Sequence, residues 1–461
     1  MFVLMASPCT ADVLCLFERI APESWFENLT PTTGFGSRRG IYSFAVVIWL
    51  MIVQRMQAKG TLGSALQQLL QNRPVNLLPS CKRVRDNRIS PHVGGYCQAR
   101  QKMPTRIASK VSDHVLAQLQ AALPVCPTGS QQPVFLLDGS SLELEHTAEL
   151  AAAYPPAENQ YGKAHWPILR IAVAHNLANG LASRPSWGAM YGPHAVSEQA
   201  LAEELMDRLP QAAVVVGDRN FGVFSIAYAA TERGLGVLLR LTEDRFKKLW
   251  GEVAAECGQE RSITWQASKW DRQAHPGLPE QAAVRGRLLV AQMQSGSETE
   301  FLYLFTTLSV PAQEILEIYR CRWYVETDLR SLKTTIRLHH LTAKSKAVME
   351  KELLIAITAY NMVRAVMGWA AEQSGTSPRS LSFSQVQDVV EAALPVLAAA
   401  ESPQEYALAF QSMLDTAAHF RLPTRSHRRA YPRLIWGHHQ SFPKRKLVPL
   451  ALPPSSGDKT I

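Results

Sequence analysis

The sequence predicts an α/β protein in which a mixed β-sheet is covered by helices. Between residues 134 and 241, short apolar runs rich in Val, Leu and Ile alternate with segments whose apolar residues recur every three or four positions. Strands and helices that alternate in this way form sheets with helices packed on them. At 461 residues and 46% hydrophobic content, the chain is long enough for about two to four structural units with buried cores.

Residues 1–125 are predicted to form a helical domain, with its clearest helices at 44–71 and 107–123. The apolar run at 41–53 is too short to span a bilayer and is expected to be a buried helix. A basic, turn-rich patch lies between the helices and fits either a DNA-facing surface or a solvated loop. The patch consists of Lys82, Arg83, Arg85, Arg88, Arg100, Lys102 and Arg106.

Two of the predicted strands end in an aspartate. Strand 134–137 leads into Asp138, and strand 212–216 leads through Gly217 into Asp218. Open α/β sheets place ligands just beyond the carboxyl ends of their strands. Each aspartate taken singly also fits an ordinary turn. The other elements predicted for this sheet are strands 166–175, 180–189 and 236–241, an Asn179-Gly180 hairpin turn, and helices 197–209 (capped by Ser197) and 222–233.

Residues 244–308 have a different character and are predicted to form a β-rich insertion. Runs rich in β-branched and aromatic residues predict strands at 261–266, 284–292 and 301–308, with a proline-containing loop at 271–281. Trp265 and Trp270 belong to this segment. Each fits either a packing role or stacking on an unpaired DNA base.

The most informative helix is predicted over residues 318–336. Its apolar face consists of Ile318, Cys321, Val325, Leu329, Leu332 and Ile336. At 3.6 residues per turn, a polar stripe falls beside that face. The stripe places one carboxylate among three cations and a phenol, which suits a metal ligand whose neighbours grip phosphate oxygens. An ordinary amphipathic helix with an i,i+4 ion pair fits the same pattern. The stripe consists of Tyr319, Arg322, Glu326, Arg330 and Lys333.

Residues 376–461 are predicted to form a helical region with a basic tail. Before them, the long apolar helix 347–371 is expected to cover the sheet. One or two further helices are predicted over 385–418, with interruptions at Pro395 and Pro403. A strongly basic tail begins at Arg421. Tails of this kind are often arms that bind nucleic acid. The arginines of this tail include Arg425, Arg428 and Arg429.

The formal net charge of +9 favours a polyanionic partner. The chain has seven cysteines but no CxxC pair, so neither a zinc ribbon nor a disulfide framework is indicated. The apolar N-terminal stretch lacks the basic residues of a signal peptide. These features together predict a cytoplasmic, nucleoid-associated protein with no membrane role.

Asp138, Asp218 and Glu326 can together supply the oxygen ligands of two divalent ions. Such ion pairs activate the attacking oxygen and stabilise the leaving oxygen in phosphoryl transfer. A set made only of carboxylates suits Mg²⁺, with Mn²⁺ as a substitute, rather than zinc. The sequence contains no Walker A loop, GxGxxG, HExxH or GxSxG motif, so it offers no support for those competing chemistries.

These residues carry a resemblance to a known family. Tyr319, Arg322, Glu326 and Lys333 have the spacing of the signature of the DDE transposases of the insertion sequence four (IS-four) family. Leu137-Asp138-Gly-Ser looks like the first acidic motif of that family, and Asp218-Arg-Asn-Phe221 looks like the second. The resemblance covers residues 133 to about 370. It departs from the family at Asn220, where a small residue is usual; asparagine tolerates the left-handed backbone that the turn would need.

The resemblance implies a ribonuclease-H-like catalytic core at 126–243 and 309–375, interrupted by the insertion at 244–308. It implies that the three acids hold two Mg²⁺ ions and that a homodimer binds paired element ends. Tyr319, Arg322 and Lys333 would then contact DNA phosphates, with Arg330 on the same stripe. The DNA partners of such an enzyme would be the terminal inverted repeats of the element and the target DNA. The enzyme would cut the element ends and join them to the target in cut-and-paste transposition.

Two other functions fit the same residues. One is a metal-dependent DNA nuclease of the same fold, which cleaves without strand transfer. The other is a domesticated DNA-binding protein that no longer cleaves. The presence of all three acids counts against the second.

Overall fold

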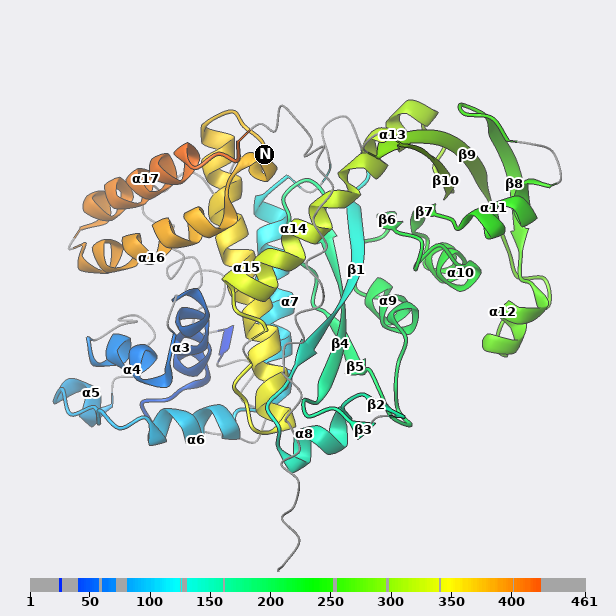
Figure 1. The fold of residues 1–461 in the computed structure, drawn as a ribbon. Coiled ribbons are helices and arrows are strands. Elements are labelled where there is room, and N and C mark those ends of the chain that lie inside the picture. Colours follow the sequence, from blue (N-terminus) through cyan, green and yellow to red (C-terminus); the bar gives the residue numbers. More distant parts are fainter. Residues whose placement is uncertain are drawn as a thin grey trace, which may run out of the picture.

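A computed structural model describes residues 25–26, 40–57, 60–71, 81–124, 126, 131–160, 162–251, 255–295, 298–339, 341–400 and 402–423. Within these residues the strands form one eight-stranded mixed sheet, in the order β5-β4-β1-β6-β7-β10-β9-β8, and a separate two-stranded ribbon. Helices cover the sheet, and an all-helical body lies beside it (Figure 1). The α/β class predicted from the sequence is confirmed. Arg425, Arg428 and Arg429 lie outside the described residues.

The first part of the sheet combines an antiparallel meander with parallel strands. Strand β1 (Val134–Glu143) pairs antiparallel with β4 (Ile168–Asn176), which pairs antiparallel with β5 (Ser186–Ala189). On its other side β1 runs parallel to β6 (Val214–Gly217), which runs parallel to β7 (Gly236–Arg240). These boundaries confirm the strands predicted at 166–175, 212–216 and 236–241 and the hairpin, although regular pairing in the second hairpin strand starts only at β5.

Strand β1 is longer than predicted, and Asp138 lies within it rather than beyond its end. Its parallel pairing with β6 stops at Leu136, but its antiparallel pairing with β4 continues to Glu143. Among the described residues, this edge of β1 therefore has no strand partner from about Asp138 onward. The prediction of a strand end at Leu137 is wrong because β4 supplies hydrogen-bond partners that no local pattern reveals.

The strands predicted as a β-rich insertion continue the same sheet. β10 (Glu298–Thr306) pairs antiparallel with β7, and β9 (Ala283–Ser295) and β8 (Glu260–Gln266) follow outward. The short helix α12 (Lys269–Ala274) occupies part of the segment predicted as a loop. Helix α11 (Glu243–Trp250) precedes these strands.

The two faces of the sheet bury different side chains, as the alternation along a strand requires. Phe135 and Leu137 pack with helices α9 (Glu198–Met206) and α10 (Phe224–Glu232). Val134 and Leu136 point to the other face and pack with residues of α13 (Ala312–Arg320). Further along β1, Leu142 joins a large core that contains most of the helical body.

The helical body surrounds α15 (Lys346–Gln373), whose central residues are almost entirely buried. This helix is long and apolar enough to cross a membrane, but 94% of its most apolar window is buried by other parts of the protein, as in the core helix of a globular domain. Around it lie α3 (Phe44–Met56), α6 (Gly94–Lys102), α7 (Thr105–Ala122), α16 (Phe383–Ala399) and α17 (Pro403–His419). Helix α4 (Leu62–Leu70) packs on α3 and α6, and α5 (Lys82–Arg85) lies farther out (Figure 1).

Two predictions for the helical parts are wrong. Helix α16 runs through Pro395 without ending there, whereas Pro403 does lie at the start of α17, where its missing N–H leaves no hydrogen bond unmade. Arg100 does not belong to a DNA-facing patch, because it is 6% exposed and forms a buried ion pair with Glu352. Glu352 also pairs with Arg55 at 2.8 Å, so this network joins α3 and α6 to α15. The basic residues Lys82, Arg83, Arg85 and Arg88 are exposed.

Candidate active site on strands β1 and β6

Asp138 and Asp218 lie level with each other on neighbouring parallel strands. The last paired residues of the two strands are Leu136 and Val216, and each aspartate follows two residues later. Asp218 immediately follows the end of β6 and accepts a hydrogen bond of 2.9 Å from the backbone N–H of Asn220. Asp138 accepts one of 2.8 Å from the N–H of Gly139. Parallel register thus brings together two acids that are 80 positions apart in the chain.

The environment of Asp138 disfavours its negative charge. Burial raises the pKa of this carboxyl to about 6, the Gly139 N–H and Arg322 lower it, and Asp218 and Glu198 raise it. A half-buried carboxylate beside two further acids would be stabilised by a bound cation. Its oxygens are the ligand type that Mg²⁺ and Mn²⁺ prefer. The pair of aspartates therefore fits a divalent ion.

The helix predicted over 318–336 is continuous in direction but changes its winding. Helix α13 passes through a 3₁₀ turn (Cys321–Trp323) into α14 (Tyr324–Arg330), and a π-helical turn (Ser331–Thr335) follows. The tighter and the wider turn together leave the predicted apolar residues facing the core, five of them buried and Cys321 partly so. π-Helical turns inside helices frequently occur at functional sites.

Glu326 and Arg322 form an ion pair on this helix, with 2.9 Å between Oε1 and Nη2. Burial acts to lower the pKa of Arg322, but the Glu326 hydrogen bond, Tyr319 and Asp218 raise it above its usual range. Arg322 thus interacts electrostatically with all three predicted catalytic acids. Within the part of the chain that the structure describes, no three Asp, Glu, His or Cys side chains converge as a metal site. In this arrangement the Glu326 carboxylate therefore pairs with Arg322 and does not form a three-carboxylate cluster with the two aspartates.

The remaining stripe residues have different environments. Lys333 donates hydrogen bonds to the Ser140 hydroxyl (3.1 Å) and the Ser141 carbonyl (3.3 Å), which ties the π-helical turn to β1. Arg330 is exposed. Tyr319 is only 5% exposed, and its buried hydroxyl has no hydrogen-bond partner among the described residues. Burial raises the pKa of Tyr319, while Arg322 acts to lower it. The phenol therefore lies beneath the site rather than on the surface.

The two tryptophans of the β8–α12 segment have opposite environments. Trp265 is 4% exposed and makes edge contacts with Phe224 and Phe305, at ring distances of 5.9 and 4.9 Å. Base stacking by Trp265 is therefore a wrong prediction, because its ring is part of the core. Trp270 is 75% exposed, and its stacking on DNA stays a prediction.

Sequence reasoning missed two residues at this site. Glu198, the first residue of α9, lies so close to β1 that a Cβ at position 139 would be 2.6 Å from its carboxyl carbon. Its carboxylate accepts a hydrogen bond of 2.5 Å from Asn220. Trp323 is 55% exposed next to Arg322. The sequence contains a signal for each residue. Glu198 is an acid directly after a helix cap, and Trp323 is an apolar residue that lies off the apolar face of the predicted helix.

Asn220, the one departure from the family pattern, does not adopt the left-handed backbone that was expected to accommodate it. Its side chain instead accepts a hydrogen bond of 2.9 Å from Gln199 and donates the one to Glu198. It thus links α9 to the loop that carries Asp218.

Comparisons with known proteins show the family to which the chain belongs. Residues 129–362 match the family model described as "Transposase DDE domain". The chain is also 25% identical, over 399 residues, to the transposase InsG for insertion sequence element IS4 of Escherichia coli (strain K12), an alignment that covers 85% of this chain and 84% of the relative. The matched segment contains Asp138, Asp218 and Glu326. The chain therefore belongs to the DDE transposases, as its resemblance to the insertion sequence four family predicts, and it is an enzyme that acts on DNA.

Proposed function

We propose that Asp138, Asp218 and Glu326 are the catalytic acids of this transposase and that it moves its element by a cut-and-paste reaction. The observation that carries the proposal is the level placement of Asp138 and Asp218 on β1 and β6. The helix that bears Glu326 packs against β1, the strand of Asp138. The three acids come from separate parts of the chain, and the contact between α14 and β1 supports their convergence in the active complex.

The core is proposed to be ribonuclease-H-like, and the strand order supports this. β5, β4 and β1 form an antiparallel meander, and β6 and β7 follow β1 in parallel, so that the acids sit on the central strand and its parallel neighbour. Residues 1–125 are proposed to bind the element end, with exposed Lys82, Arg83, Arg85 and Arg88 available for phosphates.

The metal ions are proposed to be two Mg²⁺, for which Mn²⁺ can substitute. When bound, they activate the attacking oxygen and stabilise the leaving oxygen of the phosphodiester. Asp138 and Asp218 would hold them from the sheet and Glu326 from α14. Arg322, freed from Glu326, becomes a phosphate ligand, because a guanidinium binds phosphate oxygens through paired hydrogen bonds.

Further DNA contacts are assigned to groups on the helix that bears Glu326 and on α12. Arg330 and Lys333 are proposed to bind backbone phosphates, and Trp323 and Trp270 to stack on unpaired bases. Tyr319 would join them if the site opens on DNA. The DNA partners are the inverted repeats at the element ends and the target duplex. Because two ends must be joined to one target, the active form is proposed to be a homodimer working in the bacterial cytoplasm at the nucleoid.

An assay that measures DNA cleavage and strand transfer in the same reaction tests the proposal. Labelled DNA from the flanks of the gene is incubated with a target plasmid and Mg²⁺. Wild type should both cut the end and join its 3′-OH to the plasmid, and cutting without joining would identify a nuclease. Replacing Asp138, Asp218 or Glu326 by Ala should abolish both steps. The matched control is Asp207→Asn, an exposed acid in the same core that pairs with Arg233 at 2.6 Å. Normal cleavage by Asp218→Ala would refute the assignment.

A further inference from the structure

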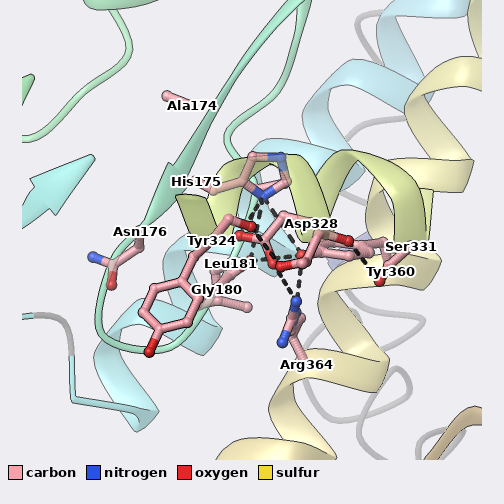
Figure 2. Close-up of polar contacts among 12 residues, drawn as sticks. Ala174, His175, Asn176, Gly180, Leu181, Tyr324, Asp328, Ser331, Tyr360 and Arg364 are labelled. Carbon is pink, nitrogen blue, oxygen red and sulfur yellow. Dashed lines mark hydrogen bonds and ion pairs between the residues drawn. The ribbon is translucent and has the colours of Figure 1, made fainter. Parts of the chain in front are cut away.

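A second carboxylate on α14, Asp328, is completely buried two residues after Glu326. It forms ion pairs with Arg364 and with Arg379, whose Nη1 lies 2.7 and 2.5 Å from the two carboxylate oxygens. His175 lies 3.7 Å from one of those oxygens (Figure 2). Side chains two positions apart on a helix point about 200° apart. Glu326 and Asp328 therefore lie on roughly opposite sides of α14.

The partners of Asp328 come from three separate parts of the fold. Arg364 belongs to α15, Arg379 to the 3₁₀ turn Pro378–Ser380, and His175 to β4. Arg379 also donates hydrogen bonds to the carbonyls of Asn176 (2.6 Å) and Leu177 (2.9 Å), at the turn after β4. One carboxylate thus connects α14 to the core helix and to the hairpin that pairs with the Asp138 strand.

The same cluster is extended by hydrogen bonds around the hairpin turn. Arg364 donates to the Tyr360 hydroxyl at 2.8 Å, and that hydroxyl donates to the Gly180 carbonyl at 3.0 Å. The Arg379 guanidinium also lies over the ring of Tyr324, 5.2 Å from its centre, on the first turn of α14. Both ends of this short helix are therefore held from its buried side.

Overall stability alone does not account for this arrangement. Removing charged groups from water is costly, and buried ion pairs are often no more stabilising than apolar side chains of the same size. The cluster instead fixes the position of α14, because each hydrogen bond constrains both a distance and an angle. The helix so constrained is the one that must place the Glu326 carboxylate opposite Asp138 and Asp218.

We propose that Asp328 is a positioning residue for catalysis, holding α14 at the depth and rotation that allow Glu326 to complete the acidic site. This inference rests on the proposed role of Glu326. Asp328 touches neither DNA nor the reacting atoms, and it acts through the orientation of the helix. Loss of its charge should therefore slow the chemical step while leaving DNA affinity nearly unchanged.

The chain contains a matched control for this experiment. Glu352 is also a buried carboxylate that pairs with two arginines, Arg55 and Arg100, but it ties α15 to the N-terminal helices rather than to α14. Glu352→Gln should lower stability in the same manner as Asp328→Asn without changing the position of Glu326. The comparison separates a loss of folded protein from a loss of positioning.

The experiment measures three quantities for each variant: the thermal midpoint by circular dichroism, the Kd for a labelled element end in EDTA, and the single-turnover cleavage rate at saturating DNA with Mg²⁺. Asp328→Asn should lose on the order of 10- to 100-fold in rate, the usual effect of removing a group that orients a metal ligand, with Kd within about threefold of wild type. Asp328→Glu, which restores the charge, should recover part of the rate. Glu352→Gln should cleave within about threefold of wild type per folded molecule.

Two results would overturn the proposal: a rate for Asp328→Asn that falls only with its folded fraction, or an equal loss of rate in Glu352→Gln. If Asp328→Asn does not fold, Arg379→Lys takes its place, since it keeps the buried charge but loses the paired geometry. Glu326→Gln separates this inference from the proposed function. Normal cleavage by Glu326→Gln would reject both, whereas an inactive Glu326→Gln beside a fully active Asp328→Asn would reject only the role of Asp328.

Discussion

The Arg322 guanidinium donates a hydrogen bond to the Glu326 carboxylate across one helical turn, with 2.9 Å between the two atoms. Both side chains are partly exposed, at 20% and 34%. The same guanidinium interacts electrostatically with Asp138 and Asp218. Arg322 therefore supplies positive charge to the acidic site, and the same group is suited to bind DNA phosphate once Glu326 releases it.

The first prediction separates Glu326 from Lys333. Glu326→Ala should bind element ends as well as wild type in EDTA, or slightly better, because it frees Arg322 for phosphates, yet it should not cut. Lys333→Ala should bind more weakly and cut slowly, with a loss of about 1.5–3 kcal/mol expected for a charge-assisted hydrogen bond. A gel-shift titration in EDTA beside a cleavage assay in Mg²⁺ measures both. Equal loss of binding and cleavage in Glu326→Ala would indicate an ordinary structural residue.

The second prediction concerns pH. Burial, Asp218 and Glu198 raise the pKa of Asp138 to about 6, so metal binding below that pH must displace a proton. Mg²⁺ affinity should fall by up to about tenfold per pH unit as the pH drops below 6. The stability of the metal-free protein should change with pH in the opposite direction to the Mg²⁺ affinity. Folding disfavours the ionised form of Asp138, so stability should decrease as the pH rises towards 6 and then level off.

Isothermal titration calorimetry with Mg²⁺, repeated in buffers of different ionisation enthalpy, measures both the affinity and the protons released. Asp138→Asn is the control, because it should bind Mg²⁺ weakly at every pH and release no proton in this range. A pH-independent affinity in wild type would show that Asp138 is not a ligand.

The third prediction concerns Gly222, in the turn between Asp218 and α10. A Cβ at this position would lie 2.0 Å from the carbonyl oxygen of Arg240, a backbone atom that cannot move aside without shifting β7. Gly222→Ala should therefore destabilise the protein by about 1–3 kcal/mol in urea unfolding. Gly277→Ala is the matched control, because a Cβ added there would have no other atom within 4 Å. Its effect should stay within about 0.5 kcal/mol.

The fourth prediction contrasts the two tryptophans. Trp265→Ala removes a buried ring and should cost about 3–5 kcal/mol of stability. Trp270→Ala should leave stability nearly unchanged but weaken binding to ends with unpaired bases by about 1–3 kcal/mol. Fluorescence-monitored unfolding and anisotropy titrations measure the two effects. Normal DNA affinity in Trp270→Ala would remove that residue from the DNA interface.

The fifth prediction concerns the basic tail. Each phosphate contact contributes a slope of about −0.9 to a plot of log affinity against log salt. Replacing Arg425, Arg428 and Arg429 together by Ala should weaken end binding and flatten that slope. A fluorescence anisotropy series over a range of KCl concentrations measures it. An unchanged slope would assign the tail to dimerisation or solubility instead.

The sequence by itself determined the local elements and the chemistry. Ser197 before a periodic apolar segment specifies the start of α9, since a cap and an apolar stripe act within one or two turns. The spacing of Tyr319, Arg322, Glu326 and Lys333, together with an acid after each of two apolar runs, was sufficient for the transposase family, because residue type and spacing carry the reaction.

Only the tertiary structure decided which groups meet. β1 continues past Asp138 because β4 pairs with it, and Arg100 is buried because Glu352 comes from a helix about 250 residues later. Glu198 approaches Asp138 through the packing of α9 on the sheet, and Asp328 lies in the core because two arginines reach it from separate elements. Such contacts join segments distant in sequence, so their free energy depends on the folded arrangement and leaves no local pattern to read.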